Sequence, residues 1–169
     1  MYVELQAFNA IKLVSRNISF DNRGTFRRIF DSQENEFVPR QISFSKNINP
    51  LTLRGMHFLD ESQQEFKIVE CVSGSLFDVL VDCRVSSENY LNYTSIKLSE
   101  DSAFAVLIPP GFAHGYITQE PNTSLVYQMS AEYDVLHEKG LRWDDPSVRI
   151  DWPFQPSFIS DKDSAWELL

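Results

Sequence analysis

The chain has 169 residues, within the usual size of a single domain, and its 24 acidic and 15 basic residues give a net charge of −9. This charge argues against nucleic acid as the main partner, while a local basic pocket for a small anion stays compatible with it. The first residues have neither a basic start nor a long apolar run, and no segment reaches membrane-spanning length. We therefore expect one domain over residues 1–169 that contacts no membrane. Cys71 and Cys83 lie in apolar runs and are expected to be reduced thiols, as in a cytoplasmic protein.

The sequence predicts a succession of short β-strands. Strands are expected between turn signals, where residues alternate or form apolar runs: one or two in residues 1–20, and one each in 41–45, 53–58, 66–72, 75–83, 94–98, 103–108 and 124–129. Residues 21–24 (Asp-Asn-Arg-Gly) are a strong turn signal, and Pro109-Pro110-Gly111 ends another strand. We expect Ser73-Gly74 to close a β-hairpin between residues 66–72 and 75–83.

Helix is expected only near the C-terminus. A short helix is predicted at Ser164–Leu169, with Ser160 or Asp161 as its N-cap. Many short strands with Gly and Pro turns are typical of an all-β sandwich or barrel, and a jelly roll fits this pattern.

Four polar side chains stand out because they lie in otherwise apolar strands. Arg54 and His57 belong to one short run, and such groups must face a solvated cavity or find partners. Lys67 shares a strand face with apolar neighbours, so it either points into a cavity or reaches back to water from the strand end. Tyr127 lies on an apolar strand face, where it is either a core aromatic or a proton donor.

Signatures of several reaction classes are missing. The sequence has no phosphate loop, dinucleotide fingerprint or GxSxG elbow. No two of the histidines are spaced to share a face, and there is no HxH pair, so we expect neither a metal site nor a cupin oxygenase. His57 as base and Tyr127 as acid would suit proton abstraction next to a carbonyl, although a satisfied strand histidine fits the pattern of His57 as well. The cations that could stabilise an enolate are Arg23, Arg54 and Lys67.

Five segments, taken in order, carry a resemblance to a known family. They are Arg23-Gly24 and residues 54–58 (RGMHF), 67–84 (KIVECVSGSLFDVLVDCR), 108–115 (IPPGFAHG) and 140–153 (GLRWDDPSVRIDWP). Together they resemble the dTDP-4-dehydrorhamnose 3,5-epimerase family. The resemblance implies a cupin-type jelly roll, or double-stranded β-helix, that acts without a metal or an organic cofactor. It also implies a homodimer in which the N-terminal strands cross between subunits.

The same resemblance implies roles for individual residues. His57 matches the catalytic base, Asp163 the carboxylate that orients this base, and Tyr127 the proton donor on the opposite side of the sugar. Lys67 matches a lysine near the C4 carbonyl, and Tyr133 an aromatic that lines the substrate cleft. The residues that match those holding the nucleotide diphosphate and the sugar are Arg23, Arg54, His114, Glu138 and Lys162.

The implied activity is inversion of C3, C5 or both in a nucleotide-linked 4-keto-6-deoxy sugar. His57 would remove a proton alpha to the ketone, Lys67 would stabilise the enolate, and Tyr127 would return a proton from the other face. The product would be a deoxysugar for a surface polysaccharide or a glycosylated natural product. Two alternatives stay open. One is a 3,4-ketoisomerase, which would not need Tyr127 opposite the base, and the other is a non-catalytic jelly roll that binds nucleotide sugars.

The spacing of Arg54 and His57 conflicts with regular strand geometry. Residues three apart on a regular strand face opposite sides. If both side chains line one cavity, the backbone must shift between them. We therefore expect a bulge or kink at Gly55.

Three places depart from the family pattern. Leu59 stands where the family usually has Gln, and Arg28 stands where it usually has Glu. Residues 41–45 (QISFS) stand where the dTDP-rhamnose enzymes have Gln-Asp-Asn-His-Ser. All three lie in or near substrate-binding positions, so the identity of the nucleotide and of the inverted carbon stays open.

Overall fold

The computed structural model describes residues 2–4, 10–33 and 35–169. Its strands are β1 (Tyr2–Glu4), β2 (Lys12–Ser15), β3 (Ile18–Asp21), β4 (Gly24–Arg27), β5 (Gln41–Asn47), β6 (Leu53–Leu59), β7 (Lys67–Ser73), β8 (Ser75–Asp82), β9 (Tyr93–Ser99), β10 (Phe104–Ile108), β11 (Phe112–Thr118), β12 (Thr123–Met129) and β13 (Glu138–Gly140). A 3-10 turn (Glu61–Gln63) and a one-turn helix α1 (Asp161–Ser164) complete the described elements. Within these ranges, no helix has the length and apolarity that crossing a membrane requires.

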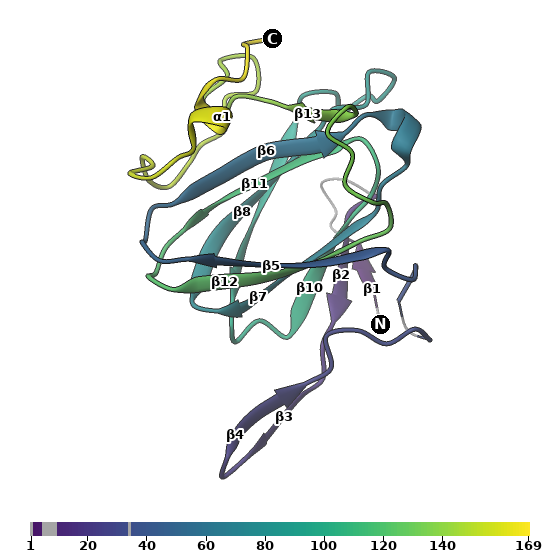
Figure 1. Ribbon diagram of the computed structural model, residues 1–169, viewed down its shortest axis with the longest axis vertical. Coiled ribbons are helices and arrows are strands. Elements are labelled where there is room, and N and C mark those ends of the chain that lie inside the picture. The colour runs from purple at the N-terminus through teal and green to yellow at the C-terminus, as the bar shows by residue number, and fades with distance from the viewer. Residues whose placement is uncertain (1, 5–9, 34) are drawn as a thin grey trace.

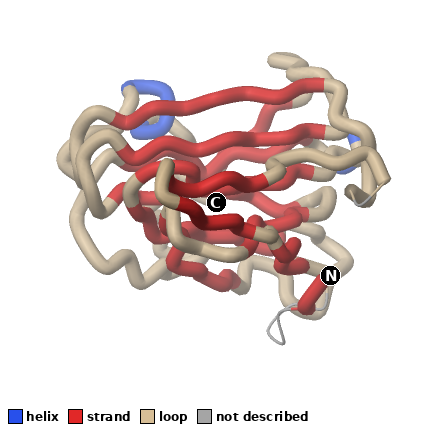
Figure 2. The backbone as a smooth tube through the Cα atoms, turned by 90° about the horizontal axis from the view of Figure 1, so that it is seen from below, coloured by secondary structure: helices blue, strands red, loops and turns tan. Residues whose placement is uncertain are grey.

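Two antiparallel sheets face each other (Figures 1 and 2). One has the strand order β1-β2-β10-β7-β12-β5 and the other the order β13-β6-β11-β8-β9. From β5 onward the chain passes repeatedly from one sheet to the other, with only β8 and β9 consecutive in the same sheet. Between the sheets, Val69 and Leu125 of the first meet Leu76 and Leu80 of the second in one buried core. This is the jelly roll that the sequence predicted.

The predicted β-hairpin across Ser73-Gly74 is wrong. β7 and β8 belong to different sheets, so Gly74, with a φ of +72°, turns the chain from one layer into the other. β8 is buried on both faces, because Val79 and Val81 pack against the C-terminal segment while Leu76 and Leu80 fill the core. A turn signal reports that the chain reverses, but buried area decides which strands then pair.

The predicted C-terminal helix is misplaced. The helix covers Asp161–Ser164 and not residues 164–169, although Ser160 is the N-cap as expected and accepts a hydrogen bond from the Asp163 backbone N–H. After this turn the chain makes tertiary contacts instead. The Trp166 ring packs over Gly140, and the Leu169 backbone N–H donates to Asp145 Oδ2 at 2.8 Å. These contacts replace further turns of a helix whose short sequence gives it little stability of its own.

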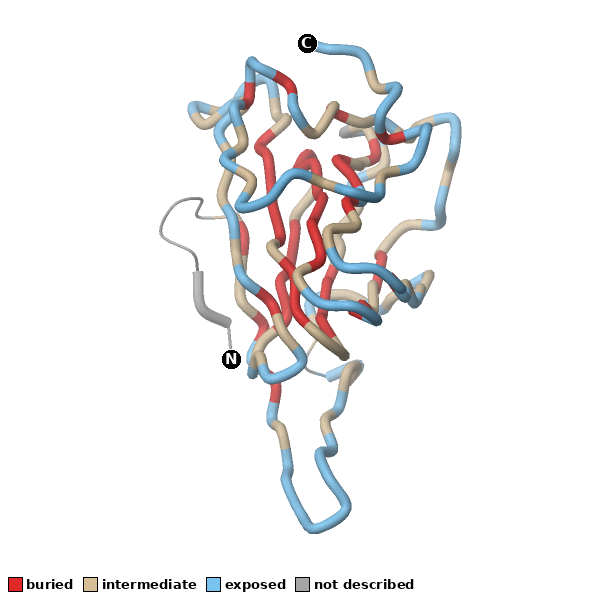
Figure 3. The backbone as a smooth tube through the Cα atoms, turned by 90° about the vertical axis from the view of Figure 1, so that its left-hand side faces the viewer, coloured by how far each residue is buried: buried red, intermediate tan, exposed pale blue. Residues whose placement is uncertain are grey.

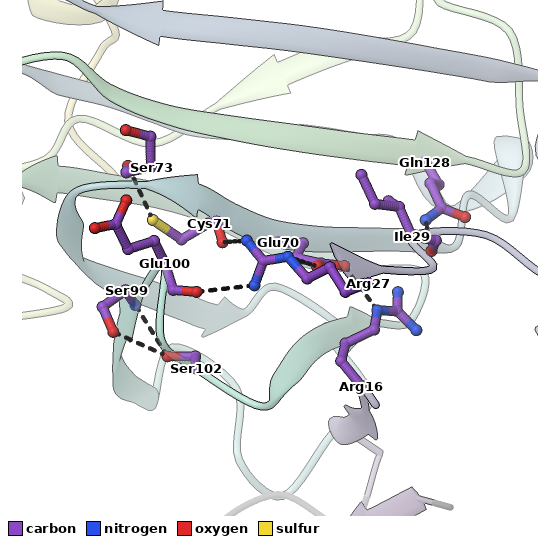
Figure 4. Close-up of polar contacts among 10 residues, drawn as sticks. All are labelled: Arg16, Arg27, Ile29, Glu70, Cys71, Ser73, Ser99, Glu100, Ser102 and Gln128. Carbon is purple, nitrogen blue, oxygen red and sulfur yellow. Dashed lines mark hydrogen bonds and ion pairs between the residues drawn. The ribbon is translucent and has the colours of Figure 1, made fainter. Parts of the chain in front are cut away.

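A buried charge cluster fixes the base of the β3–β4 hairpin to the six-stranded sheet (Figure 4). Glu70 of β7 has a side chain only 1% exposed and contacts Arg16 Nε at 2.7 Å and Arg27 Nε at 3.3 Å. Arg27 also donates to the Glu100 and Cys71 carbonyl oxygens. Two guanidinium groups therefore depend on one buried carboxylate.

Replacing Glu70 by Ala is expected to lower the free energy of unfolding by about 3–5 kcal/mol, because two largely buried cations lose their counter-ion. Urea denaturation monitored by tryptophan fluorescence measures this loss. The matched control is Glu36→Ala, which breaks the half-exposed Lys12–Glu36 pair and should change stability by about 1 kcal/mol or less. Equal effects of the two variants would contradict a stabilising role for the cluster.

Candidate active site

The strand that carries Arg54 and His57 is irregular, as predicted. Opposite it, His114 pairs with His57 and Tyr116 pairs with Arg54, so Gly55 and Met56 together face Gly115 alone. Gly55 has a φ of +128°, and a Cβ at this position would lie 2.4 Å from the Gly115 Cα. Only glycine fits this close approach. The extra residue turns Arg54 and His57 toward the same cavity.

His57 is held by a carboxylate from the distant C-terminal segment. Its Nε2 lies 2.7 Å from Asp163 Oδ1, and the Gly55 backbone N–H donates to Asp163 Oδ2 at 3.2 Å. The Trp166 ring lies edge-on to the imidazole, with 6.4 Å between centroids. With Nε2–H donated to the carboxylate, Nδ1 is the nitrogen left to accept a proton.

Asp163 remains ionised at neutral pH. Burial alone would raise the pKa of this carboxyl, but the hydrogen bonds from His57 and from the Gly55 backbone outweigh it and hold the pKa below its ordinary value. A carboxyl with a lowered pKa stabilises the folded state above its ordinary pKa, and this contribution is lost as the pH falls through the lowered value. The His57–Asp163 pair is therefore intact across the neutral range.

Tyr127 approaches the same space from the opposite sheet. It lies on β12, whereas His57 lies on β6, and both line two adjoining cavities of about 170 and 360 Å³. Burial, followed by the neighbouring Tyr116 hydroxyl, raises the pKa of Tyr127 well above 10. Its hydroxyl therefore keeps its proton at any physiological pH, as a proton donor must.

Lys67 is the third group common to both cavities. Its side chain is 17% exposed and forms an ion pair with Glu65, with Nζ 3.4 Å from Oε2. The ammonium group points into the space that the two cavities share and does not reach back to bulk water. Of the two interpretations that the sequence left open, the structure supports the inward one. We call the two adjoining cavities together the cleft.

The other candidate residues divide between the two ends of the cleft. Tyr133 and Glu138 line the smaller cavity, while Arg54, His114 and Lys162 line the larger one. Glu138 bridges the ends, because it accepts from the Tyr133 hydroxyl at 2.7 Å and from Lys162 Nζ at 2.6 Å. Burial would raise the pKa of Glu138, but the hydrogen bonds from Lys162 and Tyr133 hold it below its ordinary value. The same bond to Glu138 raises the pKa of Lys162.

Arg23 does not lie at the cleft. It sits on the turn of the β3–β4 hairpin, which projects from the body of the molecule and is exposed along most of its length (Figures 1 and 3). Its side chain is 85% exposed and pairs with Asp21 at 2.6 Å. The predicted substrate contact of Arg23 is therefore not made within one chain.

Two residues of the site were not singled out from the sequence. Asp78 is fully buried on β8, and its Oδ1 lies 2.7 Å from His114 Nε2. Glu65 lines the smaller cavity beside Lys67. The available signal for Asp78 was a lone acid in an apolar strand, since a buried carboxylate needs a partner.

Of the three departures from the family pattern, only some lie at the cleft. Leu59 lines the smaller cavity, where it adds an apolar wall. Within residues 41–45 the positions that differ are 42–44, and Ile42 and Phe44 are exposed. Arg28 is largely exposed and pairs with Asp31 at 2.7 Å.

Among the described residues, the His, Cys, Asp and Glu side chains form no group of three that could hold a metal ion.

Comparison with known proteins gives a consistent result over almost the whole chain. A family model described as dTDP-4-dehydrorhamnose 3,5-epimerase matches residues 6–169. The sequence is 35% identical to the dTDP-4-dehydrorhamnose 3,5-epimerase of Sinorhizobium fredii, over 98% of this chain and 88% of that protein.

Solved structures give the same match in three dimensions. The fold is similar to the dTDP-4-dehydrorhamnose 3,5-epimerase of Bacillus anthracis with TDP and PPi bound, with a TM-score of 0.92 and 29% identity over 100% of this chain and 99% of that one. It is also similar to RmlC from Legionella pneumophila in complex with dTDP-4-keto-L-rhamnose. That match has a TM-score of 0.91 and 28% identity, over 99% of this chain and 92% of that one.

Proposed function

Because this chain belongs to the dTDP-4-dehydrorhamnose 3,5-epimerase family, we propose that it inverts both C3 and C5 of a nucleotide-linked 4-keto-6-deoxy sugar in deoxysugar biosynthesis. The substrate is of the dTDP-4-dehydro-6-deoxyglucose type. The observation that carries this proposal is the position of His57 and Tyr127, which come from opposite sheets and line one cleft together with Lys67.

The reaction follows from the acidity of protons next to a ketone. C3 and C5 both adjoin C4, so loss of a proton from either carbon gives an enolate at the C4 oxygen. His57 takes this proton on Nδ1, the C–H electron pair moves into the enolate, and the Lys67 ammonium stabilises the negative oxygen. The enolate then takes the proton of the Tyr127 hydroxyl on its opposite face, which inverts the carbon. His57 then releases its proton to water and the Tyr127 phenolate takes one up, so that a second round can invert the other carbon.

Asp163 supports the base in this scheme without exchanging a proton with the sugar. Its ionised carboxylate accepts from Nε2, fixes the tautomer, and stabilises the imidazolium that forms when His57 is protonated. Asp78 is the corresponding partner of His114. We propose that His114 donates a hydrogen bond to the sugar from the larger cavity.

The cationic end of the cleft suits the diphosphate. Arg54 and Lys162 line the larger cavity, where they would pair with phosphate oxygens. Tyr133 is 59% exposed and offers an aromatic face at the edge of the smaller cavity. We propose that the bound nucleotide extends over this edge and is held by Tyr133 and Lys162, the two residues that Glu138 fixes in place.

We also propose that the chain is cytoplasmic and works as a homodimer. The projecting hairpin exposes 75% of Phe20 and 72% of Phe26, and the outer face of β5 exposes 59% of Ile42 and 63% of Phe44. Exposed apolar residues of this size favour burial against a partner. In the dimer, the hairpin would carry Arg23 to the other subunit.

Proton NMR of the reaction in deuterated water tests the proposed function. With dTDP-4-dehydro-6-deoxyglucose we expect inversion at C3 and C5, one deuterium at each inverted carbon, and a ketone that stays at C4. A ketone that moves to C3 would instead establish a 3,4-ketoisomerase. Binding of the nucleotide sugar without turnover would establish a non-catalytic jelly roll. Repeating the assay with UDP-, CDP- and GDP-linked sugars identifies the nucleotide.

A further inference from the structure

The mechanism above leaves one charged residue of the cleft unused. Glu65 lines the smaller cavity together with His57, Lys67 and Tyr127. Its side chain is 12% exposed, and its Oε2 lies 3.4 Å from Lys67 Nζ. A carboxylate withdrawn from water beside a reacting centre is costly to keep unless it has a role or a partner.

The backbone holds Glu65 and Lys67 on the same side of the chain. Between them, the Phe66 N–H donates to Ser130 Oγ at 2.8 Å, and the Phe66 carbonyl accepts from the Ser130 N–H at 2.9 Å. The Phe66 ring packs in the separate cluster with Phe37, with 6.3 Å between the ring centroids. Because side chains alternate along an extended segment, the residues on both sides of Phe66 face the cleft.

We infer that Glu65 holds the Lys67 ammonium in place in the cleft, which makes Glu65 a positioning residue for the reaction. This inference rests on the proposed function, because it assigns Lys67 to the enolate oxygen. An ammonium that stabilises an enolate must be fixed near the position of the enolate oxygen. The ion pair with Glu65 restricts the Lys67 side chain before substrate binds.

Other charged and titratable groups also face Lys67 across the cleft. From the remaining strands and the C-terminal turn these are His57, Tyr127, Glu138, Arg54, His114, Lys162 and Asp163. Glu138 is engaged by Lys162, and Asp163 by His57. Within the part of the chain that the structure describes, the carboxylate in an ion pair with Lys67 is that of Glu65.

The test is Glu65→Gln, which keeps the size of the side chain and removes its charge. We expect kcat at neutral pH to fall about tenfold with KM changed less than about twofold, because the lost interaction acts on the enolate. Glu88→Gln is the matched control, since it removes the same charge from an exposed loop position.

A second measurement does not depend on turnover. In protein with 13C-labelled lysine, the NMR signal of Lys67 at neutral pH should shift in Glu65→Gln, because the ammonium has lost the carboxylate that holds it, and Lys67→Arg assigns the signal. An unchanged Lys67 signal, or a Glu65→Gln enzyme with the wild-type kcat, would overturn the inference. Absence of epimerisation by the wild-type protein would overturn the proposed function instead, and the Lys67 signal would still decide the role of Glu65.

Discussion

The His57→Ala variant is expected to lose epimerase activity by about 10³- to 10⁴-fold in kcat. The Nδ1 atom of His57 is the base in the scheme, and Asp163 on Nε2 both orients it and stabilises its protonated form. Removing the imidazole removes the base and leaves the Asp163 carboxylate without its main partner. The measurement is the steady-state rate of inversion at C3 and C5, read by NMR.

The matched control for this variant is His137→Ala. His137 pairs with Asp134 at 2.7 Å and lies outside both cavities of the cleft, so its loss should leave kcat within about twofold. Substrate affinity should change little in His57→Ala, because the cations of the larger cavity remain. A His57→Ala enzyme that inverts the sugar at the wild-type rate would show that another group is the base.

The Tyr127→Phe variant is expected to lose inversion by about 10²- to 10⁴-fold in kcat. Burial raises the pKa of this hydroxyl well above 10, so the wild-type residue holds its proton until the strongly basic enolate forms. Because its pKa is raised, Tyr127 stays protonated as the pH rises, so it does not cause a decline of activity below pH 10. Phenylalanine keeps the ring packing and removes only the hydroxyl that carries the proton.

Tyr90→Phe is the control for this change. Tyr90 lies in the loop between β8 and β9, outside the two cavities, and the variant should retain wild-type activity. Both variants should melt within a few degrees of the wild type, since each loses a single hydroxyl. Full inversion by Tyr127→Phe would assign the returning proton to another donor or to water.

Much of the fold could be predicted from local patterns. Strands with clear alternation, such as Gln41–Asn47 and Thr123–Met129, agree with the prediction to within two residues. The irregularity at Gly55 was predictable because two functional side chains three residues apart cannot share a face of a regular strand. The apolar residues on the same strand face left two directions open for Lys67, and only the structure shows that its side chain lines the cleft.

The errors share a physical cause, which is that long-range contacts decide between local alternatives. Ser73-Gly74 marks a turn in either a hairpin or a crossover between sheets, and only the packing of the two sheets distinguishes them. The C-terminal helix ends early because Trp166 is drawn onto Gly140. Arg23 belongs to the site only by resemblance, since within one chain its hairpin projects from the body of the molecule and Arg23 lines neither cavity.

The contact between His57 and Asp163 could not be predicted from local sequence patterns. These residues are 106 positions apart, and no periodicity connects them. The resemblance to the family predicted the contact, and the geometry agrees with it. Asp78 has no such guide, because a lone acid in an apolar strand indicates that a partner exists without identifying it. Glu65 follows a polar loop, where an acidic residue carries no signal of a site.

One measurement tests most directly whether a base and an acid act on opposite faces of the sugar. In deuterated water, NMR can follow deuterium entry into recovered substrate separately from inversion. Tyr127→Phe should exchange protons alpha to the ketone through His57 and return deuterium to the same face, so substrate gains deuterium without inverting. His57→Ala should neither exchange these protons nor invert the sugar. Inversion at the wild-type rate in Tyr127→Phe, or undiminished exchange in His57→Ala, would contradict a two-sided mechanism.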